Sequence, residues 1–431
     1  MVVDFSQIAV RINENLQEKF QFISPTDLNE LTNTVLYRFD FGQCINHFTI
    51  FKENGMRLRA FCAGLIFIAG VATGSQALAV TELNASVWFP DSQPLAKFGY
   101  LEWAKKVAEV SKGDLKIKVF TGTSLLTPNA HLSGLRDGIA DITYHAGTYT
   151  PADLPEDNVL AILGIGMSDP IATTFAVADF YLNDADMRAL WKKQGIVFMG
   201  AYASVPYNLI CRRKVETLAD LKGLKLRTPG PVHAEWAKSV GATPVNVPSS
   251  EMFTGLDKGQ IDCAVNGSNE LKTRSLWDVA KFVNTVNQGP YFAGWLWAMN
   301  GAKWASLNNA QRRILLDTIA DSTVETEIAY IAAGVDALKE SAKHGVTVSE
   351  PNAEMKKSMQ DFAKEARKMA IKEGQTRFNL KNPEALIARF EATEAKWAKL
   401  LANVDRGDEK GLKAVLKKNL YDTIDVATHG R

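Results

Sequence analysis

The sequence has few cysteines, few histidines and almost no net charge, and each shortage excludes a class of function. Its six histidines show no paired metal-ligand spacing, so we expect no metal site. A Gly-x-Ser-x-Gly elbow, a P-loop and a Gly-x-Gly-x-x-Gly turn are all missing, so we expect no cofactor and no enzyme activity. A net charge of +1 over 431 residues gives no field that attracts a polyanion, which argues against nucleic acid as a partner.

A membrane-spanning run is missing as well. The one run that approaches this length, Phe61–Ala72, falls short of the roughly 20 apolar residues that a membrane helix needs. Two arginines precede it and a small-x-small triplet follows it, the pattern of a secretory signal peptide cleaved after Ala79. Because this pattern begins at Met56, we interpret 56–79 as the signal peptide and 1–55 as a spurious N-terminal extension, with a genuine extension as the alternative. The remaining chain is expected in the periplasm, exported and not embedded in the membrane.

Only two of the four cysteines, Cys211 and Cys263, lie after the predicted cleavage site. An oxidising compartment permits a disulfide between them, but the sequence does not supply the geometry that such a bond requires. We therefore expect two buried free thiols, with the disulfide as the alternative.

An internal sequence repeat indicates two similar halves. Gly134–Asp141 and Gly255–Asp262 both read Gly-Leu-x-x-Gly-x-x-Asp, and both lead into a short apolar run. A second matched pair, Leu115–Lys118 and Leu224–Arg227, lies upstream in the same order. The glycines are expected to end helices in the left-handed conformation, the final aspartates to be structural, and the apolar runs to form buried strands. Because strands and helices alternate here, the pattern predicts two α/β lobes with parallel sheets.

Two later segments extend this prediction. Gly294–Asn300 is apolar on both faces, so we expect a strand inside a sheet, with its tryptophans in the core. From Leu307 to Lys343 the apolar residues are alternately four and three apart, which predicts one helix of about 50 Å. That length exceeds one lobe, so the helix is expected to span both.

Ligands of an open α/β sheet bind beyond the carboxyl ends of its strands. Arg227 closes a predicted strand, and Thr228–Pro231 turns directly into a helix whose first amides are free donors. A guanidinium beside a helix N-terminus receives carboxylates or phosphates; an ion pair with a neighbouring acid is the alternative. The other side chains expected to contact the ligand are Trp88, Tyr144, His145, Tyr207, Ser249 and Asn266.

The run Asp220–Pro229, which reads DLKGLKLRTP, resembles the hallmark of the solute receptors of TRAP (tripartite ATP-independent periplasmic) transporters. The likeness covers essentially the whole exported chain. In that family the arginine at the position of Arg227 pairs with the substrate carboxylate, and the asparagine at the position of Asn266 hydrogen-bonds to the ligand. This chain departs from the family where Tyr207 replaces a frequent second arginine, so a second anionic group on the ligand is less expected. Ser249 replaces a frequent aromatic residue, so the pocket is expected to differ from that of the best-known acidic-sugar or dicarboxylate receptors.

The resemblance implies an α/β, two-lobed periplasmic-binding-protein fold (type II-like) with hinge strands and a long helix that spans both lobes. We place lobe I in 80–205 and 290–330, and lobe II in 206–289 and 331–431 with the C-terminal helices. The predicted function is that of a periplasmic receptor that captures an organic acid between its lobes and delivers it to the small and large TRAP membrane subunits. The alternatives are a periplasmic α/β enzyme acting on a small carboxylate and a binding protein of an ATP-driven or sensory system.

Overall fold

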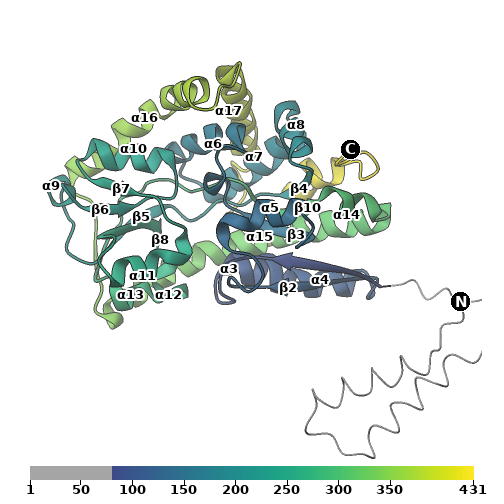
Figure 1. Ribbon diagram of the computed structural model, residues 1–431, viewed down its shortest axis with the longest axis horizontal. Coiled ribbons are helices and arrows are strands. Elements are labelled where there is room, and N and C mark those ends of the chain that lie inside the picture. Colours follow the sequence, from purple (N-terminus) through teal and green to yellow (C-terminus); the bar gives the residue numbers. More distant parts are fainter. Residues whose placement is uncertain (1–79) are drawn as a thin grey trace, which may run out of the picture. The chain divides into compact units, whose positions relative to one another are not determined.

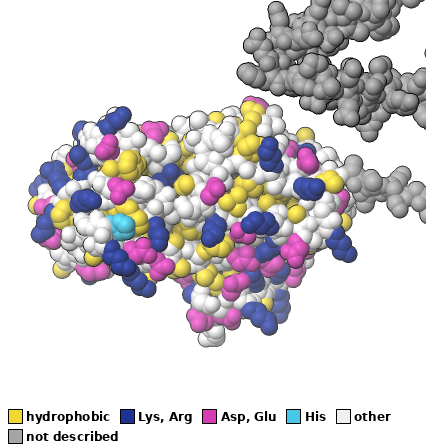
Figure 2. All heavy atoms as spheres, turned by 90° about the horizontal axis from the view of Figure 1, so that it is seen from below, with side chains coloured by type: hydrophobic (Ala, Val, Ile, Leu, Met, Phe, Trp, Pro, Cys, Tyr) yellow, Lys and Arg dark blue, Asp and Glu magenta, His cyan; other side chains and the backbone are white. Residues whose placement is uncertain are grey.

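Two β-sheets surrounded by helices make up residues 80–431, the part of the protein that the computed structural model describes (Figure 1). The predicted signal peptide and N-terminal extension lie outside the described residues. Within 80–431, no helix is long and apolar enough to cross a membrane. Figure 2 shows basic and acidic side chains interspersed over one face, as the small net charge suggests. The mixed α/β architecture agrees with the predicted fold class.

The first sheet has five strands in the order β2-β1-β3-β10-β4. Strand β1 is parallel to β2 and β3, whereas β10 is antiparallel to both of its neighbours. The prediction of a parallel sheet is wrong at β10, because the chain enters this strand from the second sheet without the crossover helix that parallel pairing requires. The tryptophans of β10 are fully buried in the core, as predicted. The strands are β1 Thr81–Ser86, β2 Leu115–Phe120, β3 Ile142–His145, β4 Ile196–Gly200 and β10 Trp295–Asn300.

The second sheet has six strands in the order β11-β9-β5-β8-β6-β7. It is also mixed, because β6 is parallel to β7 and β8 while β5 is antiparallel to β8 and β9. Two crossing segments, 201–206 and 285–294, join the sheets and lie side by side, since Ser204 and Tyr291 exchange two hydrogen bonds. The strands are β5 Tyr207–Cys211, β6 Lys225–Arg227, β7 Thr243–Val245, β8 Cys263–Gly267, β9 Phe282–Asn284 and β11 Thr347–Ser349.

The repeated motif occupies equivalent places in the two sheets. Gly138 and Gly259 both have positive φ, of 72° and 67°, as predicted for residues that end helices. Asp141 accepts a 2.8 Å hydrogen bond from a backbone amide of β1, and Asp262 accepts one of the same length from β6, so both aspartates are structural. This makes β6 the counterpart of β1. The second matched pair of sequences, which aligned β2 with β6, therefore does not mark equivalent strands.

The long helix α15, Asn309–Glu340, confirms the predicted spanning helix. Its 32 residues correspond to about 48 Å. It packs on α4 and β4 beside the first sheet and on α12 beside the second, and Figure 1 shows it running past both. The other α-helices are α3 Pro94–Ala96, α4 Trp103–Val110, α5 His131–Arg136, α6 Pro155–Ala161, α7 Pro170–Asn183, α8 Ala185–Lys193, α9 Leu218–Leu221, α10 Pro231–Ser239, α11 Met252–Asp257, α12 Glu270–Thr273, α13 Leu276–Val279, α14 Gly301–Ser306, α16 Ala353–Thr376, α17 Pro383–Leu400 and α18 Glu409–Asn419.

The C-terminal helices pack mainly beside the first sheet. Helix α16 contacts α6, helix α17 contacts α6 and α7, and helix α18 packs on α15. Helix α16 also contacts α10 beside the second sheet, so the assignment of these helices to lobe II stays a prediction, as do the other lobe boundaries.

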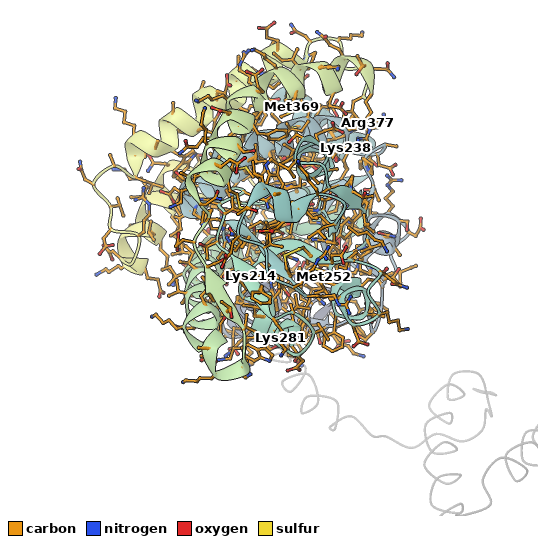
Figure 3. All side chains as sticks on the ribbon, turned by 90° about the vertical axis from the view of Figure 1, so that its left-hand side faces the viewer. Lys214, Lys238, Met252, Lys281, Met369 and Arg377 are labelled. Atoms are coloured by element: carbon orange, nitrogen blue, oxygen red, sulfur yellow. A yellow bond between two sulfur atoms is a disulfide. The ribbon has the colours of Figure 1, made fainter. Side chains whose placement is uncertain are left out.

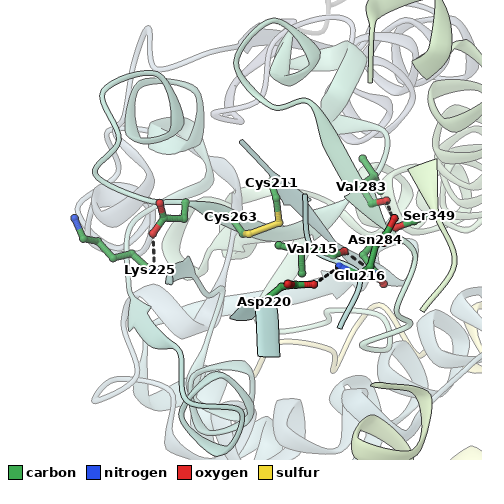
Figure 4. Close-up of a disulfide and its surroundings, with 10 residues drawn as sticks. Cys211, Val215, Glu216, Asp220, Lys225, Cys263, Val283, Asn284 and Ser349 are labelled. Carbon is green, nitrogen blue, oxygen red and sulfur yellow. Dashed lines mark hydrogen bonds between the residues drawn. A yellow bond between two sulfur atoms is a disulfide. The ribbon is translucent and has the colours of Figure 1, made fainter. Parts of the chain in front are cut away.

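Cys211 and Cys263 form a disulfide, so the prediction of two free thiols is wrong. The two residues stand opposite each other in the antiparallel pairing of β5 with β8, and both are fully buried (Figure 4). The sequence could not show this proximity, because the pairing joins residues 52 positions apart in strands whose antiparallel direction was not predicted.

Removing this disulfide is expected to lower the free energy of unfolding by about 3 kcal/mol, because the bond restricts the unfolded chain. The measurement is guanidinium denaturation of the C211A/C263A variant. Wild type refolded under reducing conditions is the control, since it keeps both sulfur atoms and loses only the bond. Equal midpoints for the oxidised wild type, the reduced wild type and the variant would contradict the expectation.

Candidate ligand-binding site

A cavity lies between the two sheets, and its wall draws on strand ends and loops of both. Six of the seven residues predicted as ligand contacts meet in this wall, and the seventh, His145, does not. The lining residues are Trp88, Phe89, Leu95, Tyr144, Ala146, Tyr149, Tyr202, Tyr207, Arg227, Pro229, Ser249, Asn266, Glu270, Tyr291 and Tyr330.

Arg227 is the basic residue of the cavity wall, and it has no acidic partner within residues 80–431. It ends β6, as predicted, and is 1% exposed. The guanidinium donates to the carbonyl oxygens of Val247 (3.0 Å) and Val265 (3.1 Å) and to the hydroxyl of Tyr149 (3.2 Å). These bonds use three of its five N–H groups. A buried charge without a counter-ion is costly, and an anion that enters the cavity relieves this cost.

Tyr149 joins the two sides of the cavity and was not predicted from the sequence. It lies in the short turn after β3, and its hydroxyl accepts hydrogen bonds from Arg227 and from the amide of Ser249 (2.9 Å), both beside the second sheet. Because the oxygen accepts twice, its own proton is left to donate. The neighbouring Thr148 reinforces the contact by donating to the carbonyl of Pro229 (2.6 Å). The sequence signal was only an aromatic residue shortly after a strand end.

Aromatic rings make up most of the remaining wall. Trp88 stacks on Tyr149 with ring centroids 5.6 Å apart, and Tyr207 lies parallel to Tyr291 at 5.9 Å. Burial raises the pKa of Tyr207 and of Tyr291 above the ordinary value, so both hydroxyls stay neutral. The wall therefore offers apolar faces that suit a flat ligand, with a few polar atoms between them. The other rings belong to Phe89, Tyr144, Tyr202 and Tyr330.

Asn266 faces the cavity from β8. Its Nδ2 donates to the sulfur of Met252 (3.2 Å), and its Oδ1 accepts from the amide of Gly267 (2.8 Å). Figure 3 views the molecule from the end that holds the second sheet and labels Met252, which is fully buried. The amide of Asn266 keeps one N–H and one oxygen lone pair for a ligand.

His145 lies outside the cavity wall. Successive side chains of a strand point to opposite faces, so Tyr144 reaches the cavity while His145 turns away from it. The His145 ring packs on Trp295 with centroids 5.0 Å apart, and its Nε2 pairs with Oγ1 of Thr150 at 2.7 Å. Burial lowers the pKa of His145 well below its ordinary value, so the ring is a neutral group of the core.

Comparisons with known proteins agree with this geometry. Residues 85–373 match the family described as bacterial extracellular solute-binding protein, family 7. The 2,3-diketo-L-gulonate-binding periplasmic protein YiaO of Escherichia coli is 28% identical over 274 residues, which cover 62% of this chain and 80% of that protein. A TRAP solute binding protein from Rhodoferax ferrireducens, in complex with copurified benzoate, has a TM-score of 0.67 at 20% identity. It is matched over 74% of this chain and 99% of its own.

A second solved structure comes from an unidentified marine microbe. This TRAP solute binding protein, specific for aromatic acid ligands, has a TM-score of 0.66 at 22% identity, over 74% of this chain and 99% of its own. The family match covers most of this chain and every residue of the cavity wall. The chain therefore belongs to the bacterial extracellular solute-binding proteins of family 7, and it is a solute-binding protein of the TRAP type.

Proposed function

We propose that this protein is the periplasmic receptor of a TRAP-type transporter for an organic acid, which it binds through the carboxylate. The observation that carries the proposal is the buried guanidinium of Arg227, which has two free N–H groups and no acidic partner in 80–431. Similar solved proteins hold benzoate, orotic acid and mandelate, which supports it. Because the wall contains eight aromatic rings, we propose an acid with a flat apolar or aromatic body.

Arg227 supplies only part of the binding free energy. A hydrogen bond to a charged group contributes about 1.5–3 kcal/mol net, whereas micromolar affinity needs about 8 kcal/mol. We propose that closure of the two lobes around the acid contributes the rest, and that Thr148 and Tyr149 make their contacts with the second lobe in this closed state. The closed receptor then delivers the acid to the small and large membrane subunits, and it catalyses no reaction. We propose that residues 56–79 direct the export of the protein and are cleaved off after Ala79.

A thermal-shift screen of the purified protein against carboxylic acids tests this function. Benzoate, mandelate, orotate and galacturonate sample the ligands of similar proteins, and mass spectrometry identifies any co-purified acid. A cognate acid is expected to raise the unfolding midpoint by mass action. Benzamide is the matched control for benzoate, because it keeps the ring and lacks the charge. An unchanged midpoint with every acid, or turnover of one of them, would overturn the proposal.

The Tyr149→Phe substitution is expected to weaken binding of the tightest acid about tenfold, because it removes the hydroxyl that Arg227 and Ser249 share and keeps the ring stacked on Trp88. Isothermal calorimetry measures the change. Tyr421→Phe is the matched control, since its hydroxyl is buried and bonded to the carbonyl of Met199, away from the cavity. Equal affinities of the two variants would count against a role for Tyr149.

A further inference from the structure

A second arginine, largely but not fully buried, stands behind the cavity wall next to a buried glutamate. Arg274 and Glu270 form an ion pair at 2.9 Å, with side chains 10% and 1% exposed. Glu270 itself lines the cavity. Arg274 reaches two other lining residues, because its guanidinium lies 5.3 Å from the ring centroid of Phe89 and its Nη2 lies 3.4 Å from Oγ of Ser249. Both charges are therefore close enough to act on a bound ligand.

Glu270 is held in place by side chains close to it in the sequence. Its Oε1 accepts a hydrogen bond from Nδ2 of Asn269 (3.1 Å), and its Oε2 accepts one from Oγ1 of Thr273 (3.2 Å). The carboxylate is thus fixed between Arg274 and the cavity. Of the three charged groups, Arg274 and Glu270 cancel, and Arg227 alone remains without a partner.

We infer that Glu270 sets the charge of the ligand: it neutralises Arg274 and so restricts the cavity to acids with a single negative charge. This inference rests on the proposed function and names its substrate class. A monocarboxylate pairs with Arg227 and leaves no charge unbalanced. A dicarboxylate brings a second charge toward a wall where Arg274 is already paired and Glu270 repels it, at a depth where unpaired charges are costly.

The Glu270→Gln variant tests this inference, because it removes the negative charge and keeps the shape of the side chain. The probes are three pairs of acids that differ by one carboxylate: benzoate with isophthalate, phenylacetate with 1,3-phenylenediacetate, and hexanoate with adipate. Calorimetry gives the ratio of the dicarboxylate Kd to the monocarboxylate Kd for each pair. In the wild type this ratio is expected to exceed ten, and in Glu270→Gln it is expected to fall at least tenfold.

Two further variants serve as controls. Glu251→Gln removes the same charge from an exposed residue close in sequence to Ser249 but outside the cavity wall, and it is expected to leave the ratio unchanged. Glu270→Gln combined with Arg274→Gln removes both charges of the pair and is expected to restore the wild-type ratio. Thermal unfolding of every variant without acid shows which of them are folded.

The outcomes separate the inference from the proposed function. Wild type that binds none of these six acids and none of the acids of the thermal-shift screen overturns the proposed function, and this inference with it. Wild type that binds monocarboxylates while Glu270→Gln keeps the same ratio overturns the inference alone. The inference alone is also overturned if a dicarboxylate binds the wild type as tightly as the monocarboxylate of the same pair.

Discussion

Replacing Arg227 with alanine is expected to abolish measurable binding of the carboxylate ligand. The acid would be buried in the cavity without a counter-ion, a loss of roughly 3–5 kcal/mol. This corresponds to a Kd that is roughly 10²- to 10⁴-fold weaker. Calorimetry with the tightest acid of the screen measures the effect, and a loss of less than tenfold would contradict the assignment of Arg227 to the ligand carboxylate.

Two other arginine variants show whether the loss of binding comes from the missing charge, from the missing guanidinium geometry or from a folding defect. Arg227→Lys keeps the positive charge, but an ammonium cannot hold Val247, Val265 and the ligand in the fixed directions of a planar guanidinium. We therefore expect its affinity to lie between those of the wild type and Arg227→Ala. Arg212→Ala removes an exposed arginine that follows β5 and lies outside the cavity wall, so it is expected to bind like the wild type.

The features that the sequence predicted well are set by neighbouring residues. Arg227 stands at a strand end because the turn Thr228–Gly230 and the proline that starts α10 follow it directly. The positive φ of Gly138 and Gly259 follows from local helix termination. The long helix α15 was visible in its own spacing of apolar residues.

The features that were missed depend on distant segments. Tyr149 lies in a turn beside the first sheet, Tyr291 in a crossing segment and Tyr330 in α15, and they meet only because tertiary packing closes one cavity around them. The disulfide and the direction of β10 were missed for the same reason, since both follow from the way the chain passes between the sheets. His145 was misplaced because the position of a strand end does not say which face a side chain points to.

The second prediction with a large expected effect concerns Glu327, a buried residue that contacts one of the crossing segments. This residue of α15 is 1% exposed, and its Oε1 accepts a hydrogen bond from the amide of Ala203 (3.2 Å), in the segment 201–206. Its Oε2 has no hydrogen-bond partner among the described residues. Burial, only partly offset by the bond from Ala203, raises the pKa of Glu327 to about 8. The folded protein therefore keeps this carboxyl group protonated at neutral pH.

The Glu327→Gln substitution is expected to stabilise the protein at alkaline pH. An unfolded glutamate has a pKa of about 4.3, so between about pH 4.5 and pH 8 the unfolded chain binds fewer protons than the folded one. The free energy of unfolding then falls as pH rises, by about 1.4 kcal/mol per pH unit from this group. Glutamine does not titrate and still accepts the bond from Ala203. The variant should match the wild type near pH 4.5 and be more stable by roughly 2–5 kcal/mol at pH 8.

Denaturation at pH 5, 6.5 and 8 checks this slope, with Glu325→Gln on the same helix as the control of opposite sign. Although burial opposes it, ion pairs with Lys106 and Lys413 at 2.6 Å lower the pKa of Glu325. Its ionised form therefore stabilises the fold above pH 4.5, and Glu325→Gln should lose stability at neutral pH. Burial also raises the pKa of Asp157, to about 7. The stability of Glu327→Gln is therefore still expected to fall with pH, but less steeply than that of the wild type. If the stability of Glu327→Gln falls with pH as steeply as that of the wild type, then Glu327 is ionised in the folded protein and is not the source of this pH dependence.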